Sequence, residues 1–315
     1  MVVMVCATPA HAGEKVAACD AAAGPTWPVL QRISPHLWRV AAQRGEPDTV
    51  NRGETTQVVI AVEASRVWLI GSGPSPAYGA SLACAVKRAT GRAVTDVVNT
   101  RAAPELAMGN VAFPQATLWA LPDVIATMRA RCVTCLERLK SRIGEAGESL
   151  QNDLIRPPDS AVQASRLGPF DWRSLPRSSP QTKDENVLVL RHRADRIVVA
   201  QGLLWEGDVP DLHEAHIDVI ASSLRALQGF AQGARLLGEQ GELTGPLAIS
   251  QHLRYVKQLR AAVWAQLQRG EVQGASGVSG VSAELPEFAS LPSYVARHPL
   301  HAQRVWRELE PAMFR

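Results

Sequence analysis

Two cysteines three residues apart, Cys132 and Cys135, form a C-x-x-C pair in the segment TMRARCVTCLERL. A dithiol at this spacing carries redox chemistry when one thiol has a low pKa, which usually requires a helix N-terminus. The apolar spacing around this pair predicts the interior of a helix, and a zinc ribbon would need a second pair that the chain lacks. We interpret the pair as two thiols on one helix face. A thiol redox function stays an alternative.

The histidines offer a second kind of chemistry. His213 and His216, in DLHEAHID, are spaced so that both imidazoles would lie on one face of a helix. We interpret them as an exposed pair in the turn before a helix, with a metal site as the alternative. His192 lies in the turn HRAD and is expected to be exposed, and His36 and His252 are isolated along the sequence. No Ser-His-Asp arrangement is evident.

Composition narrows the class of protein. The chain has 315 residues, of which 46% are hydrophobic and 20% charged, with a formal net charge of +3. These values are ordinary for a globular protein. The arginines are scattered among acidic and apolar residues, whereas a nucleic-acid surface needs a dense basic stripe. No apolar run approaches the roughly 18 residues of a membrane-spanning helix. The expected partner is a small molecule or another protein.

The N-terminal segment MVVMVCATPAHAG combines an apolar start with Ala10-His11-Ala12, a small-x-small pattern typical of signal-peptidase sites. We expect residues 1–24 to be a leader or a disordered segment. The protein is therefore expected to be exported or periplasmic, with a cytoplasmic location as the alternative. Five cysteines are too few for a disulfide scaffold, and Cys84, in ASLACAVKRAT, is expected to be a small core residue.

The strands and helices expected to position these residues occur in the same order in the first and the second half of the chain. Short Val- and Ile-rich runs predict strands, and amphipathic runs with glycine stops, such as Gly91, predict helices. Residues 151–186 carry many breakers and are expected to hold only one or two weak strands. The expected strands are 36–42, 56–64, 66–73, 94–100, 116–120, two within 186–208, and 234–238; the expected helices are 77–92, 121–147, 217–230, 248–270 and 298–310. This order indicates two similar halves, and two sheets packed face to face with helices outside would satisfy it, although periodicity alone does not determine that architecture.

Several segments together resemble the metallo-β-lactamase fold, most closely its branch of quinoprotein relay system zinc metallohydrolases. NRGETTQVVIAVEASRVWLIGSGPSPAYGASLACAVKRATGRAVTDVVNT resembles the opening half, RIVVAQGLLW resembles a later strand, and HPLHAQRVWRELE resembles the C-terminal signature. The resemblance implies an α/β fold, an αββα four-layer sandwich, with a domain over 25–275. Residues 276–315 would be a flexible link and a helical tail that packs on the domain through Val305, Trp306 and Leu309.

The resemblance also implies a zinc motif, T-H-x-H-x-D-H, after the strand that ends in VVNT. Thr100 is kept, but Arg101 and Ala103 stand at the first two histidine positions, Glu105 at the aspartate and Leu106 at the third histidine. Arginine has no lone pair to offer a metal, and alanine and leucine have no donor atom. Of these residues, only the glutamate could bind zinc.

The remaining ligand positions are changed as well. They correspond to Thr182, with its register uncertain by a residue or two, to Leu203 at the bridging carboxylate, to Gln240 in GEQG, and to Gly71 at the end of a strand. We therefore expect no zinc and no other cofactor, although zinc is usual in the family.

These losses favour a pseudoenzyme, a non-catalytic accessory or binding protein linked to quinoprotein alcohol oxidation. We expect Arg101 to pair with Glu105 or another carboxylate in the cleft, in a pocket otherwise made apolar by Leu106, Ala103 and Leu203. The alternative is a hydrolase with a displaced metal site that uses Glu105 together with the histidine pair at 213 and 216.

Overall fold

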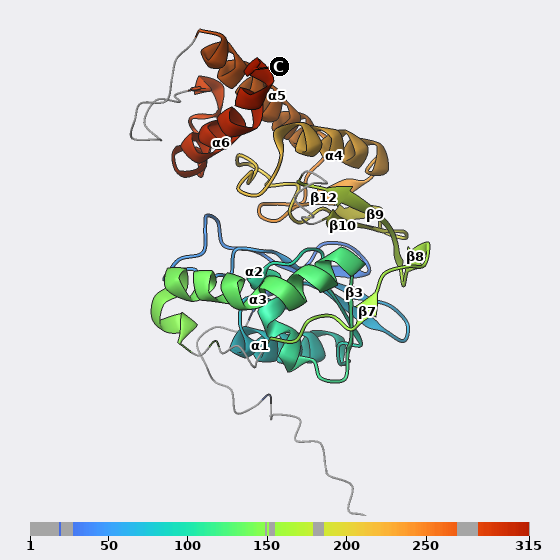
Figure 1. Ribbon diagram of the computed structural model, residues 1–315. Helices are drawn as coiled ribbons and strands as arrows, with labels where there is room; N and C mark the ends of the chain where they lie inside the picture. The colour runs from blue at the N-terminus through green and yellow to red at the C-terminus, as the bar shows by residue number, and fades with distance from the viewer. Residues whose placement is uncertain are drawn as a thin grey trace, which may run out of the picture.

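The computed structural model describes residue 19, residues 28–148, residue 150, and residues 155–178, 186–269 and 283–314. Two sheets lie face to face in the middle, and helices cover the outer face of each sheet (Figure 1). This arrangement confirms the predicted four-layer αββα sandwich.

The first sheet has seven strands in the order β1-β2-β3-β4-β5-β6-β7. The strands β1 to β4 pair antiparallel, and β4 to β7 pair parallel. Their bounds are β1 Leu30–Arg32, β2 Leu37–Val40, β3 Val58–Val62, β4 Val67–Ile70, β5 Asp96–Val98, β6 Thr117–Ala120 and β7 Ser160–Ala161.

The second sheet has five strands in the order β12-β11-β10-β9-β8. Its bounds are β8 Arg166–Leu167, β9 Phe170–Pro176, β10 Asn186–His192, β11 Ile197–Val199 and β12 Arg235–Leu237. The predicted pair of strands joined at the HRAD turn is confirmed, because β10 and β11 pair antiparallel. The expectation of only weak strands over 151–186 underestimated β9, which pairs with β10 along seven residues.

The helices are α1 Pro76–Thr90, α2 Pro104–Ala107, η1 Met108–Ala112, α3 Pro122–Ile143, η2 Gly144–Gly147, α4 Ile217–Phe230, α5 Leu247–Gln268, η5 Pro286–Phe288, α6 Tyr294–Leu309 and η6 Glu310–Phe314. The five predicted helices are confirmed as α1, α3, α4, α5 and α6, whereas the short helices α2, η1 and η5 were not predicted. The start and stop signals of α1 are local: the Ser75 hydroxyl accepts from the backbone N–H of Tyr78, and Gly91 ends the helix with φ of 73°.

Strand residues alternate between two buried faces, which explains the layers. In β10, Leu188 and Leu190 face the first sheet, whereas Val187 and Val189 face the helices α4 and α5. All four side chains are fully buried. A strand that is apolar on both faces must be covered on both, and this requirement produces four layers instead of an open sheet.

The C-terminal tail packs as expected. Val305, Trp306 and Leu309 of α6 are buried in the cluster that also holds the apolar faces of α4 and α5. The leader expected at 1–24 and the flexible link lie outside the described residues, apart from Cys19 and the final part of the link.

Cys84 corrects one expectation. It forms a disulfide with Cys19 and is only partly buried, so it is not a small core residue. The sequence pattern around Cys84 reported a helix face but carried no information about a partner 65 residues away. In the described residues no helix is long and apolar enough to cross a membrane.

Candidate functional site

The C-terminal ends of strands from both sheets meet at one edge of the sandwich. Arg101 follows β5 of the first sheet, and Glu239 follows β12 of the second. Their side chains form an ion pair, with Arg101 Nη2 at 2.8 Å from Glu239 Oε1. The arginine side chain is 16% exposed and the glutamate side chain 4%. The pair therefore links the two sheets and is largely buried. Arg101 was expected to pair with Glu105 or with another carboxylate in the cleft, and its partner is another carboxylate.

Glu239 is held by more than the arginine. The backbone N–H of Gly202 donates to Glu239 Oε2 at 2.6 Å, and the Thr56 hydroxyl donates to Glu239 Oε1. A side chain at position 202 is excluded on two grounds: φ is +78°, and its Cβ would lie 2.9 Å from Arg101 Cδ. Glu239 was missed at the sequence level, because GEQG was aligned with Gln240 at the metal-ligand position.

Gln240, at the predicted ligand position, lines the same cavity, but its side-chain amide binds backbone carbonyls. Its side-chain amide donates to the carbonyls of Gly45 and Thr55 at 2.9 and 3.0 Å, so it fastens a loop of the first sheet. Thr182 lies outside the described residues.

The side chain of Leu106 fills the space that a side chain at position 71 would need. A Cβ added at Gly71 would lie 2.7 Å from Leu106 Cδ2, and Leu106 is fully buried. A side chain at position 71 is therefore incompatible with Leu106 where it lies. The two changes at these predicted ligand positions are physically coupled.

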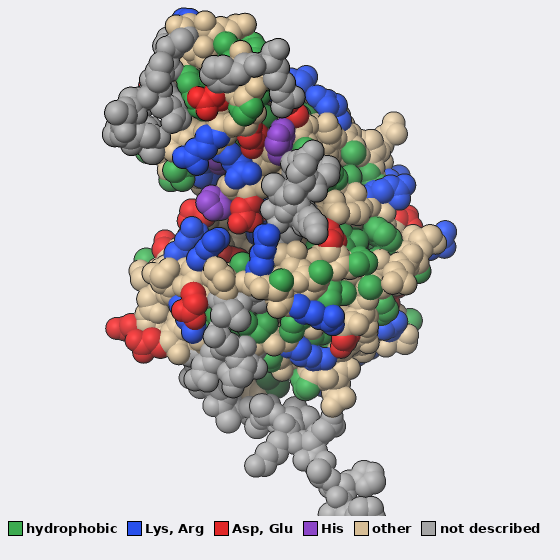
Figure 2. Space-filling model, in the orientation of Figure 1, with side chains coloured by type: hydrophobic (Ala, Val, Ile, Leu, Met, Phe, Trp, Pro, Cys, Tyr) green, Lys and Arg blue, Asp and Glu red, His purple; other side chains and the backbone are tan. Residues whose placement is uncertain are grey.

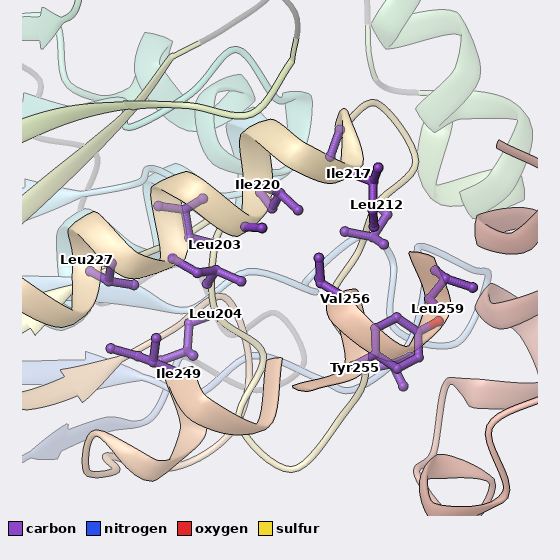
Figure 3. Close-up of a cluster of buried hydrophobic side chains, with 14 of the residues drawn as sticks. Leu203, Leu204, Leu212, Ile217, Ile220, Leu227, Ile249, Tyr255, Val256 and Leu259 are labelled. Atoms are coloured by element: carbon purple, nitrogen blue, oxygen red, sulfur yellow. The ribbon is translucent and has the colours of Figure 1, made fainter. Parts of the chain in front are cut away.

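The expected apolar pocket is wrong. Leu203 points into the hydrophobic core beneath α4 and α5, together with Leu204 and Ile220 (Figure 3). Leu106 is also sealed inside the protein, and of the three expected apolar residues only Ala103 lines the cavity. The alignment correctly placed Leu203 after β11, but it did not predict the direction of the side chain.

The cavity beside the Arg101–Glu239 pair has a volume of about 560 Å³. Figure 2 shows this face hollowed between two lobes, with cationic, acidic and histidine side chains at the walls. Glu105 and Gln240 line it with the ion pair. Its cationic lining consists of Arg101, Arg138, Arg142, Arg177, Arg297, Arg304 and Arg307, and its acidic lining of Glu46, Glu105, Asp211, Glu214 and Glu239.

Burial and nearby charges shift the pKa values of Glu105 and Asp211 in opposite directions. Burial raises the pKa of Glu105, and the nearby Arg101 guanidinium only partly opposes this effect. Burial would also raise the pKa of Asp211, but Arg177 and Arg297 outweigh it and hold that pKa well below its usual range. The cavity thus combines a firmly anionic Asp211 with a Glu105 that is more readily protonated.

The alternative metal site and the thiol pair are placed as follows. His213 is exposed at the cavity, and His216 is the N-cap residue of α4, with its Nδ1 3.8 Å from Glu308 Oε2. Within the part of the chain that the structure describes, these two histidines and Glu105 do not form a group of three ligand atoms. Cys132 and Cys135 lie inside α3, away from its N-terminus, and Cys135 lines the cavity.

The histidines of the C-terminal tail form a buried chain around Tyr255. The Leu212 N–H donates to His301 Nε2 at 3.2 Å, so His301 carries its proton on Nδ1, 2.9 Å from the Tyr255 hydroxyl. His298 Nε2 lies 2.8 Å from the Ala283 carbonyl and donates to it, so its Nδ1 accepts from Tyr255 at 3.0 Å. Burial lowers the pKa of His301 to about 3. These groups fasten α6 to α5.

Three histidines differ from expectation. His192 is fully buried although it precedes a turn, because the rings of Phe170 and His36 lie against it, with centroids 5.6 and 5.7 Å from its own. His36 is not isolated, since its Nδ1 lies 2.8 Å from Asp195 Oδ1. His252 accepts from the Trp205 N–H at 3.0 Å, and burial lowers its pKa to about 4. Turn residues next to a tightly packed hairpin can be buried, which a local sequence pattern does not report.

The fold is similar to that of solved metallo-β-lactamases. The mono-zinc form of FIM-1 from Pseudomonas aeruginosa matches with a TM-score of 0.57 and 12% identity over 73% of this chain and 94% of that chain. An enzyme from Erythrobacter litoralis matches with a TM-score of 0.55 and 14% identity over 72% and 95% of the two chains. One from Pontibacter korlensis matches with a TM-score of 0.55 and 13% identity over 73% and 98%.

The chain has the metallo-β-lactamase fold. No family model matches the sequence, and no curated protein matches it. At 9–14% identity the likeness to solved structures establishes the architecture alone.

A zinc ion does not fit the strand ends of this metallo-β-lactamase fold. Zinc sites use imidazole, thiolate or carboxylate ligands, usually four around the ion with water included. Here Arg101 places a permanent cation beside Glu239, and Leu106 fills the space over Gly71. We derive no reaction step through a metal at this place.

Proposed function

We propose that this protein is a non-catalytic member of the metallo-β-lactamase fold that binds a small anionic molecule in the arginine-lined cavity. The observation that carries this proposal is the Arg101–Glu239 ion pair between the strand ends of the two sheets. A guanidinium supplies positive charge without a lone pair, so it can neutralise Glu239 but cannot activate a water as a metal would.

Two kinds of arginine in the cavity support a binding role. Arg297 is buried and fixed, since its Nε lies 2.8 Å from Glu46 Oε1 and its Nη1 donates to the Val209 carbonyl at 3.0 Å. Arg138 and Arg142 are exposed and only loosely paired, at 3.8 Å from Glu214 and 3.6 Å from Glu46. Exposed pairs of this kind contribute at most about 1 kcal/mol. A ligand anion can therefore replace these carboxylates at small cost.

Size and charge agree with this ligand class. A volume of about 560 Å³ is typical of small-molecule sites, which run from roughly 300 to 1,000 Å³. Seven arginines face five acidic residues in the lining, and burial raises the pKa of one of those acids, Glu105. The planar guanidinium binds carboxylate and phosphate groups through paired hydrogen bonds.

The non-catalytic part is tested by metal content and turnover. Purified protein, with and without added zinc, is dialysed and analysed for metal, and hydrolysis of β-lactams and lactones is measured. We expect no hydrolysis above background and no bound zinc that is lost when a residue of the cleft is replaced. A stoichiometric zinc that disappears in Glu105→Ala or Glu239→Gln would overturn the proposal. Zinc lost only in His36→Ala is bound outside the cleft and leaves the proposal standing.

The ligand class is tested by thermal unfolding with citrate, inorganic phosphate and a neutral sugar. We expect at least one anion to raise the midpoint and the sugar to leave it unchanged. The double variant Arg138→Gln/Arg142→Gln should lose the rise. The control Arg260→Gln, which changes an exposed arginine paired with Asp218 on α4, should keep it. An equal rise in the double variant would refute binding through these arginines.

We also infer that the protein is an exported accessory of quinone-dependent alcohol oxidation. The support is the sequence resemblance of HPLHAQRVWRELE, which lies within α6 and the start of η6, and the Cys19–Cys84 disulfide, a bond typical of oxidising compartments. Cell fractionation should place the protein outside the cytoplasm. Deletion of its gene should slow alcohol oxidation; a normal rate would contradict the link.

A further inference from the structure

A second polar cluster lies at the edge of the sandwich opposite the cavity. The cavity stands beyond the C-terminal ends of β4, β5, β11 and β12, whereas Glu63 and Asp195 precede β4 and β11. His36 precedes β2, and His192 ends β10. The four side chains thus come from both sheets, two from each.

The cluster brings imidazole and carboxylate atoms together. His36 Nδ1 lies 2.8 Å from Asp195 Oδ1, and His192 Nδ1 lies 3.7 Å from Asp195 Oδ2. One ligand atom from each of these three residues falls within 4.8 Å of the others. His192 Nε2 is 3.2 Å from Glu63 Oε1, so a further carboxylate stands beside them.

We propose that His36, His192 and Asp195 form a binding site for a divalent transition-metal ion such as Zn²⁺, with water completing the coordination and Glu63 accepting a hydrogen bond from His192 Nε2. Two imidazoles and a carboxylate are a ligand set that zinc accepts. Ligand atoms around a tetrahedral zinc lie roughly 3.3 Å apart, given bonds of about 2.0–2.1 Å. The side chains therefore need to move by about 1 Å or less. Two hydrogen bonds are exchanged for bonds to the metal: the one between His36 and Asp195, and the one that the Asp195 backbone N–H donates to His192 Nδ1 at 3.2 Å.

The surroundings of Asp195 favour this role. Its Oδ2 accepts from the Ser34 hydroxyl and from the His36 N–H at 3.0 Å. Those bonds orient the carboxylate and leave Oδ1 directed at the His36 ring. Hydrogen bonds that orient a first ligand raise metal affinity, since the ligand does not have to be ordered on binding.

The site would be structural instead of catalytic. Its ligands join the first sheet to the β10–β11 turn of the second, so a bound ion would cross-link the sheets at the edge that the Arg101–Glu239 pair does not reach. A ligand that binds only the folded state raises the unfolding midpoint. The competing explanation is a hydrogen-bonded cluster that takes no metal, and the experiment below separates the two.

The test uses full-length protein stripped with a chelator. Zinc chloride is titrated by calorimetry, the thermal midpoint is followed, and Co²⁺ is added for its visible absorption in a tetrahedral nitrogen and oxygen site. We expect one ion per chain and a midpoint raised by several degrees. His36→Ala, whose side chain is 44% exposed in the wild type, should fold and bind at least about tenfold more weakly. Asp195→Asn should also fold and should also bind zinc at least about tenfold more weakly.

The matched control is His213→Ala, which removes an exposed histidine at the cavity instead. It should bind zinc as the wild type does. Wild-type binding in His36→Ala, or no binding by the wild type itself, would overturn the proposal and leave a hydrogen-bonded cluster. Failure of this proposal can be distinguished from failure of the proposed function. Zinc bound in the cleft would be lost in Glu105→Ala or Glu239→Gln, whereas zinc bound at this cluster would be lost in His36→Ala.

Discussion

Replacing Arg101 by Met tests whether the ion pair stabilises the fold. The change removes the cation and keeps an apolar stem, leaving Glu239, whose side chain is 4% exposed, without its 2.8 Å partner. Breaking a buried pair from one side costs about 3–5 kcal/mol. Gly202 and Thr56 still donate to Glu239 and the cavity admits water, so we expect about 3 kcal/mol, the low end. At roughly 2–4 °C per kcal/mol, the midpoint should fall by about 6 °C or more.

A control and a double variant sharpen this test. Arg260→Met removes an arginine that also lies 2.8 Å from its carboxylate partner, Asp218, but both side chains are about half exposed, at 44% and 55%. That change should cost less than about 1 kcal/mol. The double variant Arg101→Met/Glu239→Gln should be more stable than Arg101→Met alone, since no charge is left buried. An unchanged midpoint for Arg101→Met, within about 1 °C, would mean that the pair contributes nothing.

Three further outcomes are expected. Burial lowers the pKa of His252 from 6.5 to about 4; Asp208 opposes this shift and Arg297 adds to it. Between pH 6.5 and about pH 4, the unfolded chain therefore binds a proton at His252 that the folded chain does not bind. The unfolding free energy should therefore fall by about 2 kcal/mol from pH 7 to pH 5, and urea titrations of His252→Gln should show a smaller fall. Tyr255→Phe leaves two buried imidazoles without their shared hydroxyl and should cost about 2–4 kcal/mol by the same method. Gly71→Ala should lower the thermal midpoint, because the added Cβ would lie 2.7 Å from a leucine side chain at a φ of +79°; an unaffected midpoint would show that the loop simply shifts.

Individual strands and helices were predictable because their signals are local, whereas the four-layer architecture was implied by the resemblance to the metallo-β-lactamase fold. Short runs rich in Val, Leu and Ile identified β10 and β11, and the Gly91 stop identified the end of α1. β9 was underestimated since FDWRSLP mixes charged and aromatic residues. It is a strand because β10 offers it a full antiparallel partner, a tertiary effect that outweighs local preference.

The site was predictable only in part. The sequence indicated that Arg101 would pair with a carboxylate, yet Glu239 was not identified as that carboxylate, because the alignment of GEQG placed Gln240 at the ligand position. Leu203 was placed after the correct strand but points into the core. Side-chain direction after a strand end depends on the loop backbone, and neither periodicity nor composition encodes it. His192 and its partner Asp195 illustrate the same limit at the opposite edge.

The Arg101–Glu239 pair restricts which substitutions the chain can accept next. Changing Arg101 to a metal-binding histidine alone would leave the Glu239 carboxylate buried beside an uncharged ring, and changing Glu239 alone would take that carboxylate from the arginine. Each single step costs a few kcal/mol, a large part of the 5–15 kcal/mol by which proteins are usually stable. Leu106 and Gly71 are coupled in the same way by their shared space. A metal centre could therefore be built at these strand ends only by several changes at once, and each of those changes made alone would destabilise the fold.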